Sequence, residues 1–192
     1  DQFETYFRQP RTSMFVRIGA EVTRPYLKHW DRKTSKTVDT FICNSQNIRS
    51  KIRDYYKRES QVIHPPVDLS FFKPGILKER FYLMVGAFAP NKRVDLAVKA
   101  FNQLKLPLKI AGRGQDEAYC RSIADENIEF HGKLSNNKLL ELYQQARALI
   151  FPGEDDFGIT PLEAQACNTP VIAYASGGAL ETVTDQTGIF FS

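Results

Sequence analysis

The fold is decided by residues 81–112, which read FYLMVGAFAPNKRVDLAVKAFNQLKLPLKIAG. Residues 81–85 form a short apolar run that ends in Gly86, which is typical of a buried parallel strand. Apolar residues then recur at helical spacing, giving one apolar face made of Val94, Ala97, Val98, Phe101 and Leu104. Residues 106–111 form a second apolar run. The segment therefore predicts a strand, a helix and a second strand in a β-α-β unit.

The same alternation continues to the end of the chain. Further strands are expected at residues 128–130, 148–151, 171–174 and 189–191, with helices at 115–124, 139–146, 162–167 and from residue 180. Short loops and right-handed crossovers make this an α/β fold, a doubly wound Rossmann-like parallel sheet. Ligands bind such sheets at the carboxyl ends of the strands, so the loops after the strands are the places to look for a site.

The domain boundary is predicted in residues 64–77, an interdomain linker that contains His64-Pro65-Pro66 and Pro74-Gly75. Residues 78–192 form the ligand-binding domain. Residues 1–63 show one strand at 38–44 and one helix at 46–58, which is too little for a complete lobe. Apolar side chains in this segment would be exposed in a remnant, which predicts self-association with a neighbouring copy; they are Phe3, Tyr6, Phe7, Phe15 and Trp30.

Composition indicates an ordinary globular protein. Of 192 residues, 42% are hydrophobic and 25% are charged, and no run of eighteen apolar residues is present to cross a membrane. The first residues lack the basic and apolar regions of a signal peptide. Cys43, Cys120 and Cys167 are odd in number and far apart, which argues against a disulfide framework or a zinc site. We therefore expect a cytoplasmic location with reduced thiols.

The net charge of +4 is uneven, because the first 60 residues hold most of the basic excess. Nucleic-acid binding is not expected, since no nucleic-acid motif is present and acidic residues are interspersed. Peripheral contact with the anionic inner face of a membrane is the better functional interpretation. A solvated basic face remains the alternative.

Two loops carry glycines or cations directly after strands. Lys92 and Arg93 are expected in the first turn of a helix, where they oppose the helix dipole unless an anion binds there. The alternative is that both side chains extend into water. Gly112-Arg113-Gly114 permits close backbone approach, but it lacks the third glycine of a dinucleotide fingerprint and fits a tight turn equally well.

The loop at residues 151–163 leads from a strand into a helix. Thr160 is expected as the N-cap, Pro161 as the first helical residue and Glu163 as the partner that completes a capping box. The alternative is a ligand pocket in which the free N–H groups near Gly158 hold phosphate and a carboxylate binds sugar hydroxyls. The acidic run at residues 154–156 suggests a metal, but consecutive side chains diverge, so no metal is expected. Residues 176–181 give another glycine-rich helix entry, which Glu181 is able to cap.

The order of these motifs resembles one family. Residues 151–153, 163–166, 169–173 and 177–181 look like the signature of group 1 (family 4, GT-B) retaining glycosyltransferases, and the likeness extends back through residues 130–132, 112–114 and 92–95. It covers about residues 38–192. The Asp-Phe-Gly-Ile form of the loop at residues 155–159 is similar to enzymes described as mannosyltransferases.

The resemblance implies two Rossmann-like lobes, with residues 78–192 as the donor-binding lobe and residues 1–63 as the remnant of the acceptor lobe. It also implies that Lys92 binds the donor diphosphate, that Glu163 binds the ribose, and that residues 132–134, with Lys133 and Leu134, lie near the base. The sugar and phosphate would be lined by Asp155, Phe157, Gly158, Ile159 and Thr160.

Three departures from the family pattern stand out. Asp155 replaces the usual glutamate, and Ala87 stands where an arginine often follows the glycine, so Arg93 or Arg113 would supply the second positive charge. Family members are also about twice as long, so this chain alone is expected to be inactive.

The implied reaction transfers a hexose, mannose being favoured, from a donor of the GDP-mannose or UDP-glucose type to a glycan or lipid-linked acceptor with retention. No cofactor or metal is required, because Lys92 and the helix start near Thr160 would stabilise the diphosphate electrostatically. Asp155 and Glu163 would position the donor rather than act as a glycosidase acid and nucleophile. The alternatives are a non-catalytic nucleotide-sugar-binding module and a generic nucleotide-binding α/β domain.

Overall fold

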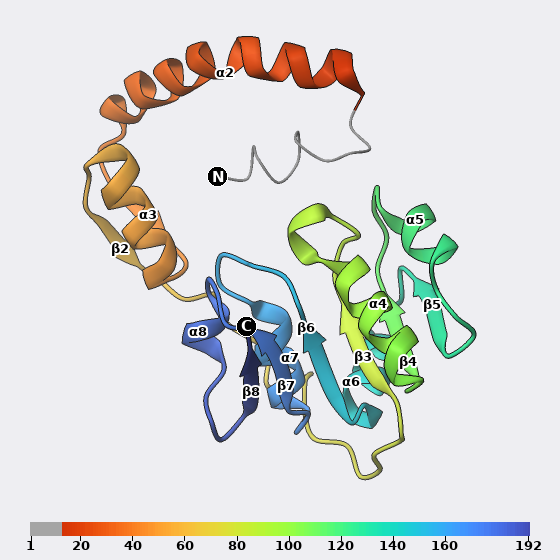
Figure 1. Cartoon of the computed structure of the whole chain (residues 1–192). Helices are drawn as coiled ribbons and strands as arrows, with labels where there is room; N and C mark the ends of the chain where they lie inside the picture. Colours follow the sequence, from red (N-terminus) through yellow and green to blue (C-terminus); the bar gives the residue numbers. More distant parts are fainter. Residues whose placement is uncertain (1–12) are drawn as a thin grey trace. The chain divides into compact units, whose positions relative to one another are not determined.

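The computed structural model describes residues 13–192 and divides the chain into two compact units at His64 and Pro65. Figure 1 shows the elements of both units, coloured along the sequence. Phe3, Tyr6 and Phe7, which were expected to be exposed, lie outside the described residues. Phe15 and Trp30 are indeed exposed, with 86% and 54% of their surface accessible. Self-association through them stays a prediction.

The first unit contains a small parallel β-α-β arrangement. Helix α2 (Met14–Thr34) and the 3₁₀ turn η1 (Ser35–Thr37) precede strand β1 (Phe41–Cys43), helix α3 (Gln46–Tyr56) and strand β2 (Ser60–Val62). The two strands pair in parallel, and Phe41 lies opposite Ser60. The identity of this unit as the remnant of an acceptor lobe stays a prediction.

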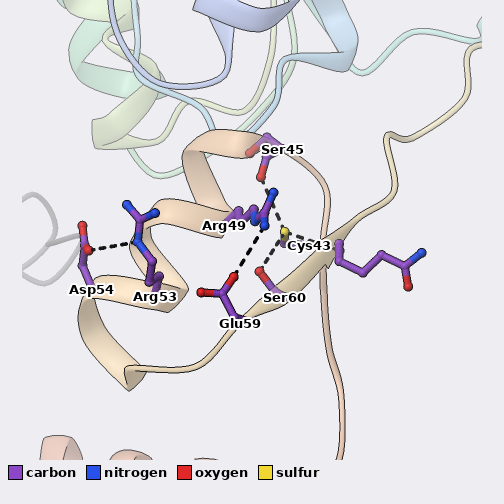
Figure 2. Close-up of polar contacts among 8 residues, drawn as sticks. Cys43, Ser45, Arg49, Arg53, Asp54, Glu59 and Ser60 are labelled. Atoms are coloured by element: carbon purple, nitrogen blue, oxygen red, sulfur yellow. Dashed lines mark hydrogen bonds and ion pairs between the residues drawn. The ribbon is translucent and has the colours of Figure 1, made fainter.

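Polar contacts join β1 to β2 and α3 to the loop before β2, as Figure 2 shows. The Ser45 side chain caps α3 by accepting a hydrogen bond from the Ile48 backbone N–H at 3.0 Å. The buried thiol of Cys43 lies 3.4 Å from the Ser60 hydroxyl, which ties β1 to β2. The guanidinium of Arg49 lies 3.5 Å from the Glu59 carboxylate. Residues 45–60 thus form a local unit whose loops are fixed by side chains.

Helix α2 corrects the expectation that this part of the chain is irregular. It runs for 21 residues and contains Pro25. Proline removes one helical hydrogen bond and usually ends or kinks a helix, which explains why the sequence pattern missed it. The hydroxyl of Thr23 bonds back to the Gly19 carbonyl at 2.8 Å, and none of the helix residues is buried. The strand expected at residues 38–44 is shorter than predicted, and β2 was not predicted.

The second unit alternates strands and helices in the predicted order. Its strands are β3 (Tyr82–Val85), β4 (Leu108–Ala111), β5 (Ile128–Gly132), β6 (Ala148–Phe151), β7 (Val171–Tyr174) and β8 (Gly188–Phe191). Its helices are η2 (Pro90–Lys92), α4 (Val94–Leu104), α5 (Glu117–Ser122), α6 (Asn136–Gln145), α7 (Ile159–Ala166) and α8 (Ala179–Thr182). The predicted fold class is therefore confirmed.

All six strands are parallel and lie in the order β5-β4-β3-β6-β7-β8. The chain first builds outward from β3 to β5 and then returns to place β6 on the other side of β3, as the two neighbouring arrows in Figure 1 show. The strand order reverses between β3 and β6. In doubly wound sheets ligands bind beside the carboxyl ends of the strands at such a reversal, so the loops after β3 and β6 are the first place to look for a site.

Alternate residues of the central strands enter two different hydrophobic cores, because successive side chains of a strand point to opposite faces. Leu83 and Leu149 belong to the core that contains residues of α6, α7 and α8. Met84 and Ile150 belong to the core that contains residues of α4 and α5. Both faces of the sheet are thus covered, and the carboxyl ends of the strands are left to carry the site. Within residues 13–192, no helix has the length and apolar character needed to cross a membrane.

Candidate functional site

An ion pair joins the loop after β3 to the loop after β6. Lys92 ends η2, which follows β3, and Asp155 lies in the loop after β6. The Lys92 ammonium donates a hydrogen bond to a carboxylate oxygen of Asp155 at 2.5 Å, and each side chain is about one quarter exposed. The sequence interpretation expected Lys92 to meet a ligand anion or water. In the structure, a protein carboxylate occupies the position of an anion beside it.

Gly153 allows the two loops to approach this closely. A Cβ atom at this position would lie 2.2 Å from the Asn91 carbonyl oxygen and 2.6 Å from the Lys92 Cα. Such distances are impossible without moving the backbone, so any larger residue at position 153 would push the β6 loop away from η2. Gly153 belongs to the sequence motif at residues 151–153, but no role was predicted for it.

The acidic run at residues 154–156 spreads its side chains apart, as expected. Asp155 faces Lys92, whereas Glu154 accepts a hydrogen bond from the Ser176 hydroxyl at 3.0 Å. The Gly178 backbone N–H donates to the Asp155 carbonyl at 2.8 Å, which ties this loop to the entry of α8. In the part of the chain that the structure describes, no cluster of three or more metal-ligating side chains is found.

The start of α7 differs from the sequence prediction. The helix begins at Ile159, and Gly158 occupies the N-cap position with φ of 95°, so Thr160 is not the N-cap. Glu163 therefore lies too far along the helix for a capping box, and that prediction is wrong. Glycine adopts a positive φ without steric cost, which lets the chain turn into the helix directly before Ile159. Phe157 beside it is buried, whereas Ile159 is exposed.

Glu163 instead binds a buried tyrosine. The Tyr143 hydroxyl on α6 donates to a Glu163 carboxylate oxygen at 2.7 Å. Burial raises the pKa of Glu163, and the hydrogen bond from Tyr143 partly opposes that rise. Tyr143 lies in the helix predicted at residues 139–146, and its spacing there matches the apolar face of the helix. Its side chain is fully buried, so only its hydroxyl distinguishes it from such a residue.

A hollow of about 210 Å³ lies at the carboxyl ends of β3, β4 and β5. Gly112 has φ of 146°, and a Cβ there would collide with the Gly86 carbonyl oxygen, so the β4 loop packs directly on the β3 loop. Gly114 packs equally closely on the Phe88 backbone. Four of the ten predicted donor-binding residues line this hollow, whereas Arg93, Gly114 and residues 157–160 do not. The lining comprises Val85, Gly86, Ala87, Ala111, Gly112, Arg113, Gly132, Lys133, Leu134 and Leu139.

Arg93 takes a different direction from Lys92. It was predicted in the first turn of α4, but it precedes that helix in a left-handed conformation with φ of 50°. Its guanidinium lies 3.3 Å from the Asp95 carboxylate, which also accepts from Lys99 at 3.1 Å. The pKa of Asp95 is lowered by these cations although burial opposes the change. Arg113, which lines the hollow, is thus better placed than Arg93 to supply a second positive charge.

Comparison with known proteins gives the family. The family model described as "Glycosyl transferases group 1" matches residues 66–192. The chain belongs to the group 1 glycosyltransferases. This match covers the whole six-stranded sheet and every loop of the site.

Two relatives of this glycosyltransferase are informative. D-inositol 3-phosphate glycosyltransferase of Mycobacteroides abscessus is 33% identical over 179 residues, which cover 79% of this chain and 40% of the relative. GDP-mannose-dependent monoacylated alpha-(1-6)-phosphatidylinositol monomannoside mannosyltransferase of Corynebacterium glutamicum is 35% identical over 116 residues, which cover 52% of this chain and 30% of the relative. The chain spans less than half the length of these relatives.

Solved structures show the same fold. Sucrose-phosphate synthase of Thermosynechococcus elongatus matches with a TM-score of 0.75 and 25% identity, over 85% of this chain and 47% of that one. HepE of Anabaena, solved in complex with UDP and glucose, matches with a TM-score of 0.71 and 18% identity, over 81% and 50%. The parallel α/β sheet is therefore shared with glycosyltransferases, whereas the roles of Lys92, Asp155 and Glu163 stay predictions.

Proposed function

We propose that this chain is the nucleotide-sugar-binding part of a retaining hexosyltransferase, and that the remnant of the acceptor lobe is residues 1–63. The full-length protein would transfer a hexose to a glycan or lipid-linked acceptor. The observation that carries the proposal is the contact between Lys92 and Asp155 where the strand order reverses. It supports the proposal because an ammonium suits phosphate, a carboxylate suits sugar hydroxyls, and ligands bind doubly wound sheets at this edge.

The chemistry follows from these charges. Breaking the bond between sugar and diphosphate leaves negative charge on the diphosphate, which the Lys92 ammonium and the free N–H groups at the start of α7 would stabilise. Asp155 would bind sugar hydroxyls and Glu163 the ribose, so both carboxylates would orient the donor. In this scheme the protein supplies the positive charge.

The hollow at the ends of β3, β4 and β5 is the proposed site of the nucleobase. Its floor is backbone, because Gly112 packs on the Gly86 carbonyl, and its wall includes the apolar side chain of Leu134. Backbone N–H and carbonyl groups of residues 132–134 would bind the base edge, while Arg113 contributes positive charge toward the phosphates. A flat apolar wall with a few polar groups suits an aromatic base.

Mannose is the proposed sugar, and GDP-mannose the proposed donor. The support is the Asp-Phe-Gly-Ile sequence at residues 155–159 and the similarity to a relative named as a GDP-mannose-dependent mannosyltransferase. UDP-glucose is the competing donor, because HepE was solved with UDP and glucose. A lipid-linked acceptor would bring the protein to the cytoplasmic membrane surface. The basic residues of α2, which include Arg32 and Lys33 in its last turn, would favour that contact.

Calorimetry with this chain tests the donor assignment. We expect GDP-mannose to bind more tightly than UDP-glucose, and both more tightly than mannose 1-phosphate, which lacks the base. A transfer assay with the full-length protein, followed by NMR of the anomeric proton of the product, tests transfer and retention. Donor binding without transfer to any acceptor would favour the non-catalytic binding module. Failure to bind either donor at millimolar concentration would contradict the site assignment.

A further inference from the structure

Tyr143 is a buried side chain whose polar end meets the carboxylate of Glu163. Its side chain is fully buried on α6, and its ring meets the ring of Phe72 edge-on at a centroid distance of 5.9 Å. A phenol hydroxyl buried in an apolar core needs a hydrogen-bond partner, since leaving it unpaired is costly. The partner in this chain is the Glu163 carboxylate at 2.7 Å.

Burial raises the pKa of Tyr143 well above its usual range, and the charge and the hydrogen bond of Glu163 raise it further. The phenol therefore stays protonated and donates this proton to the Glu163 carboxylate. A hydrogen bond in such a poorly solvated place fixes the orientation of both side chains.

The backbone of Tyr143 is fixed as firmly as its side chain. Its carbonyl accepts a hydrogen bond of 2.5 Å from the Thr169 hydroxyl, which lies just beyond α7. The same Thr169 hydroxyl accepts a bond of 2.5 Å from the Lys78 ammonium. Two contacts of Tyr143 thus join α6 to the α7 region, one through its side-chain hydroxyl and one through its backbone carbonyl. Both set its distance from Glu163.

We propose that Tyr143 is a positioning residue for Glu163. The phenol holds one carboxylate oxygen, which orients the other oxygen toward the hydroxyls of a bound nucleotide sugar. The inference rests on the proposed function, because it assigns Glu163 a place in the donor site. Tyr143 itself would not touch the donor, since its side chain is fully buried.

The surroundings of Glu163 make Tyr143 its dominant neighbour. Cys167 ends the same helix, and burial raises the pKa of its thiol to about 11. The Lys78 ammonium reaches the Cys167 carbonyl at 3.4 Å. On the elements packed against α7, the other titratable or charged groups are exposed: Lys138 and Glu141 on α6, which pair with each other, Tyr174 on β7 and Glu181 on α8.

Tyr143→Phe removes only the hydroxyl and tests the proposal by calorimetry with GDP-mannose and UDP-glucose across pH. We expect binding to weaken by about threefold to tenfold at neutral pH, the scale of one ordinary hydrogen bond, because Tyr143 acts on the donor only through Glu163. Loss of the phenol proton should also raise the pKa of Glu163. As the pH is lowered, the carboxylate should therefore become protonated, and donor binding be lost, at a higher pH than in the wild type. Tyr82→Phe is the matched control, because Tyr82 is a partly buried tyrosine in the other core.

Combining Tyr143→Phe with Glu163→Gln separates the possible outcomes. The proposal expects the pair to bind no more weakly than Glu163→Gln alone, because Tyr143 acts through Glu163. Suppose that Glu163→Gln weakens binding, but Tyr143→Phe changes neither the donor affinity nor the pH at which acid abolishes binding. Tyr143 is then merely structural, and the inference is overturned while the proposed function stands. If Glu163→Gln binds like the wild type, the donor-site role of Glu163 fails, and this inference fails with it.

A measurement on the wild-type chain covers the case in which Tyr143→Phe does not fold. The proposal expects the Tyr143 hydroxyl proton to exchange slowly and its NMR shift to titrate together with the Glu163 carboxyl carbon. Addition of GDP-mannose should move both signals. A hydroxyl signal that does not change as Glu163 titrates would overturn the inference without any substitution.

Discussion

The Lys92 ammonium lies 2.5 Å from a carboxylate oxygen of Asp155, although 63 positions separate the two residues in the chain. The contact exists because the loops after β3 and β6 meet where the strand order reverses, and because Gly153 leaves room for them to pack. In the proposed function, a donor phosphate that binds Lys92 would compete with Asp155 for the ammonium. The released carboxylate would then be available for the sugar.

Lys92→Ala should weaken binding of GDP-mannose or UDP-glucose by roughly 1.5–3 kcal/mol, the scale of a charge-assisted hydrogen bond. The free energy of unfolding should change by less than about 1 kcal/mol, because the ion pair is partly exposed and such pairs contribute little to stability. Calorimetry and urea denaturation measure the two quantities. Lys99→Ala is the control, since Lys99 pairs with Asp95 on α4 and should bind donor normally. Equal affinity for the two variants would contradict the role of Lys92.

Asp155→Asn should separate recognition of phosphate from recognition of sugar. With no carboxylate to compete for Lys92, GDP and UDP should bind about threefold to tenfold more tightly, which corresponds to roughly 1 kcal/mol. The advantage of GDP-mannose over GDP should shrink, because an amide accepts hydrogen bonds from sugar hydroxyls less strongly than a carboxylate does. Calorimetry with each nucleotide and its sugar conjugate measures both effects. Weaker binding of plain GDP would show that the ion pair holds the site open rather than competing with the ligand.

Gly153→Ala should destabilise the second unit and damage the site together. The added Cβ would meet the Asn91 carbonyl and the Lys92 Cα, so the β6 loop must move away from η2. Overpacking of this kind costs about 1–3 kcal/mol, which urea denaturation measures, and donor affinity should fall with it. Gly19→Ala is the control, because its Cβ would meet no atom within 4 Å and alanine favours a helix. A Gly153→Ala chain with normal stability and affinity would refute the close packing.

The sheet was predictable from the sequence because each strand of the second unit is a short apolar run followed by a helical pattern. Leu83 and Met84 illustrate why the signal is strong, since neighbouring residues of a strand must fill two different cores. The first unit was less predictable. Pro25 and Gly19 interrupt the pattern of α2. Both residues have low helix propensity, so the sequence pattern does not predict that the helix continues through them.

The sequence predicted only those parts of the candidate site whose location follows from the order of the strands. Lys92 and Asp155 follow neighbouring parallel strands, and the fold gathers such loops at one edge. Glu163 was assigned to a capping box because Thr160 and Glu163 match that motif locally, but the left-handed Gly158 starts the helix earlier. Its partner Tyr143 has the same spacing as a core residue. The hydrogen bond between the two helices therefore cannot be predicted from the sequence pattern and is seen only in the packed structure.

Glu163→Gln should change how stability depends on pH. Burial raises the pKa of Glu163 above its ordinary value of 4.5 in the folded chain, so the folded state binds more protons than the unfolded state between the two pKa values. The free energy of unfolding of the wild type must then fall as pH rises through this interval. Glutamine carries no charge and still accepts from Tyr143, so the variant should gain stability relative to the wild type from about pH 4 toward neutral pH.

Urea denaturation at several pH values measures this difference, with Glu126→Gln, at an exposed turn, as a control that should show no such trend. A stability difference between wild type and Glu163→Gln that stays constant from pH 4 to 7 would mean that Glu163 ionises as freely in the folded chain as in the unfolded one.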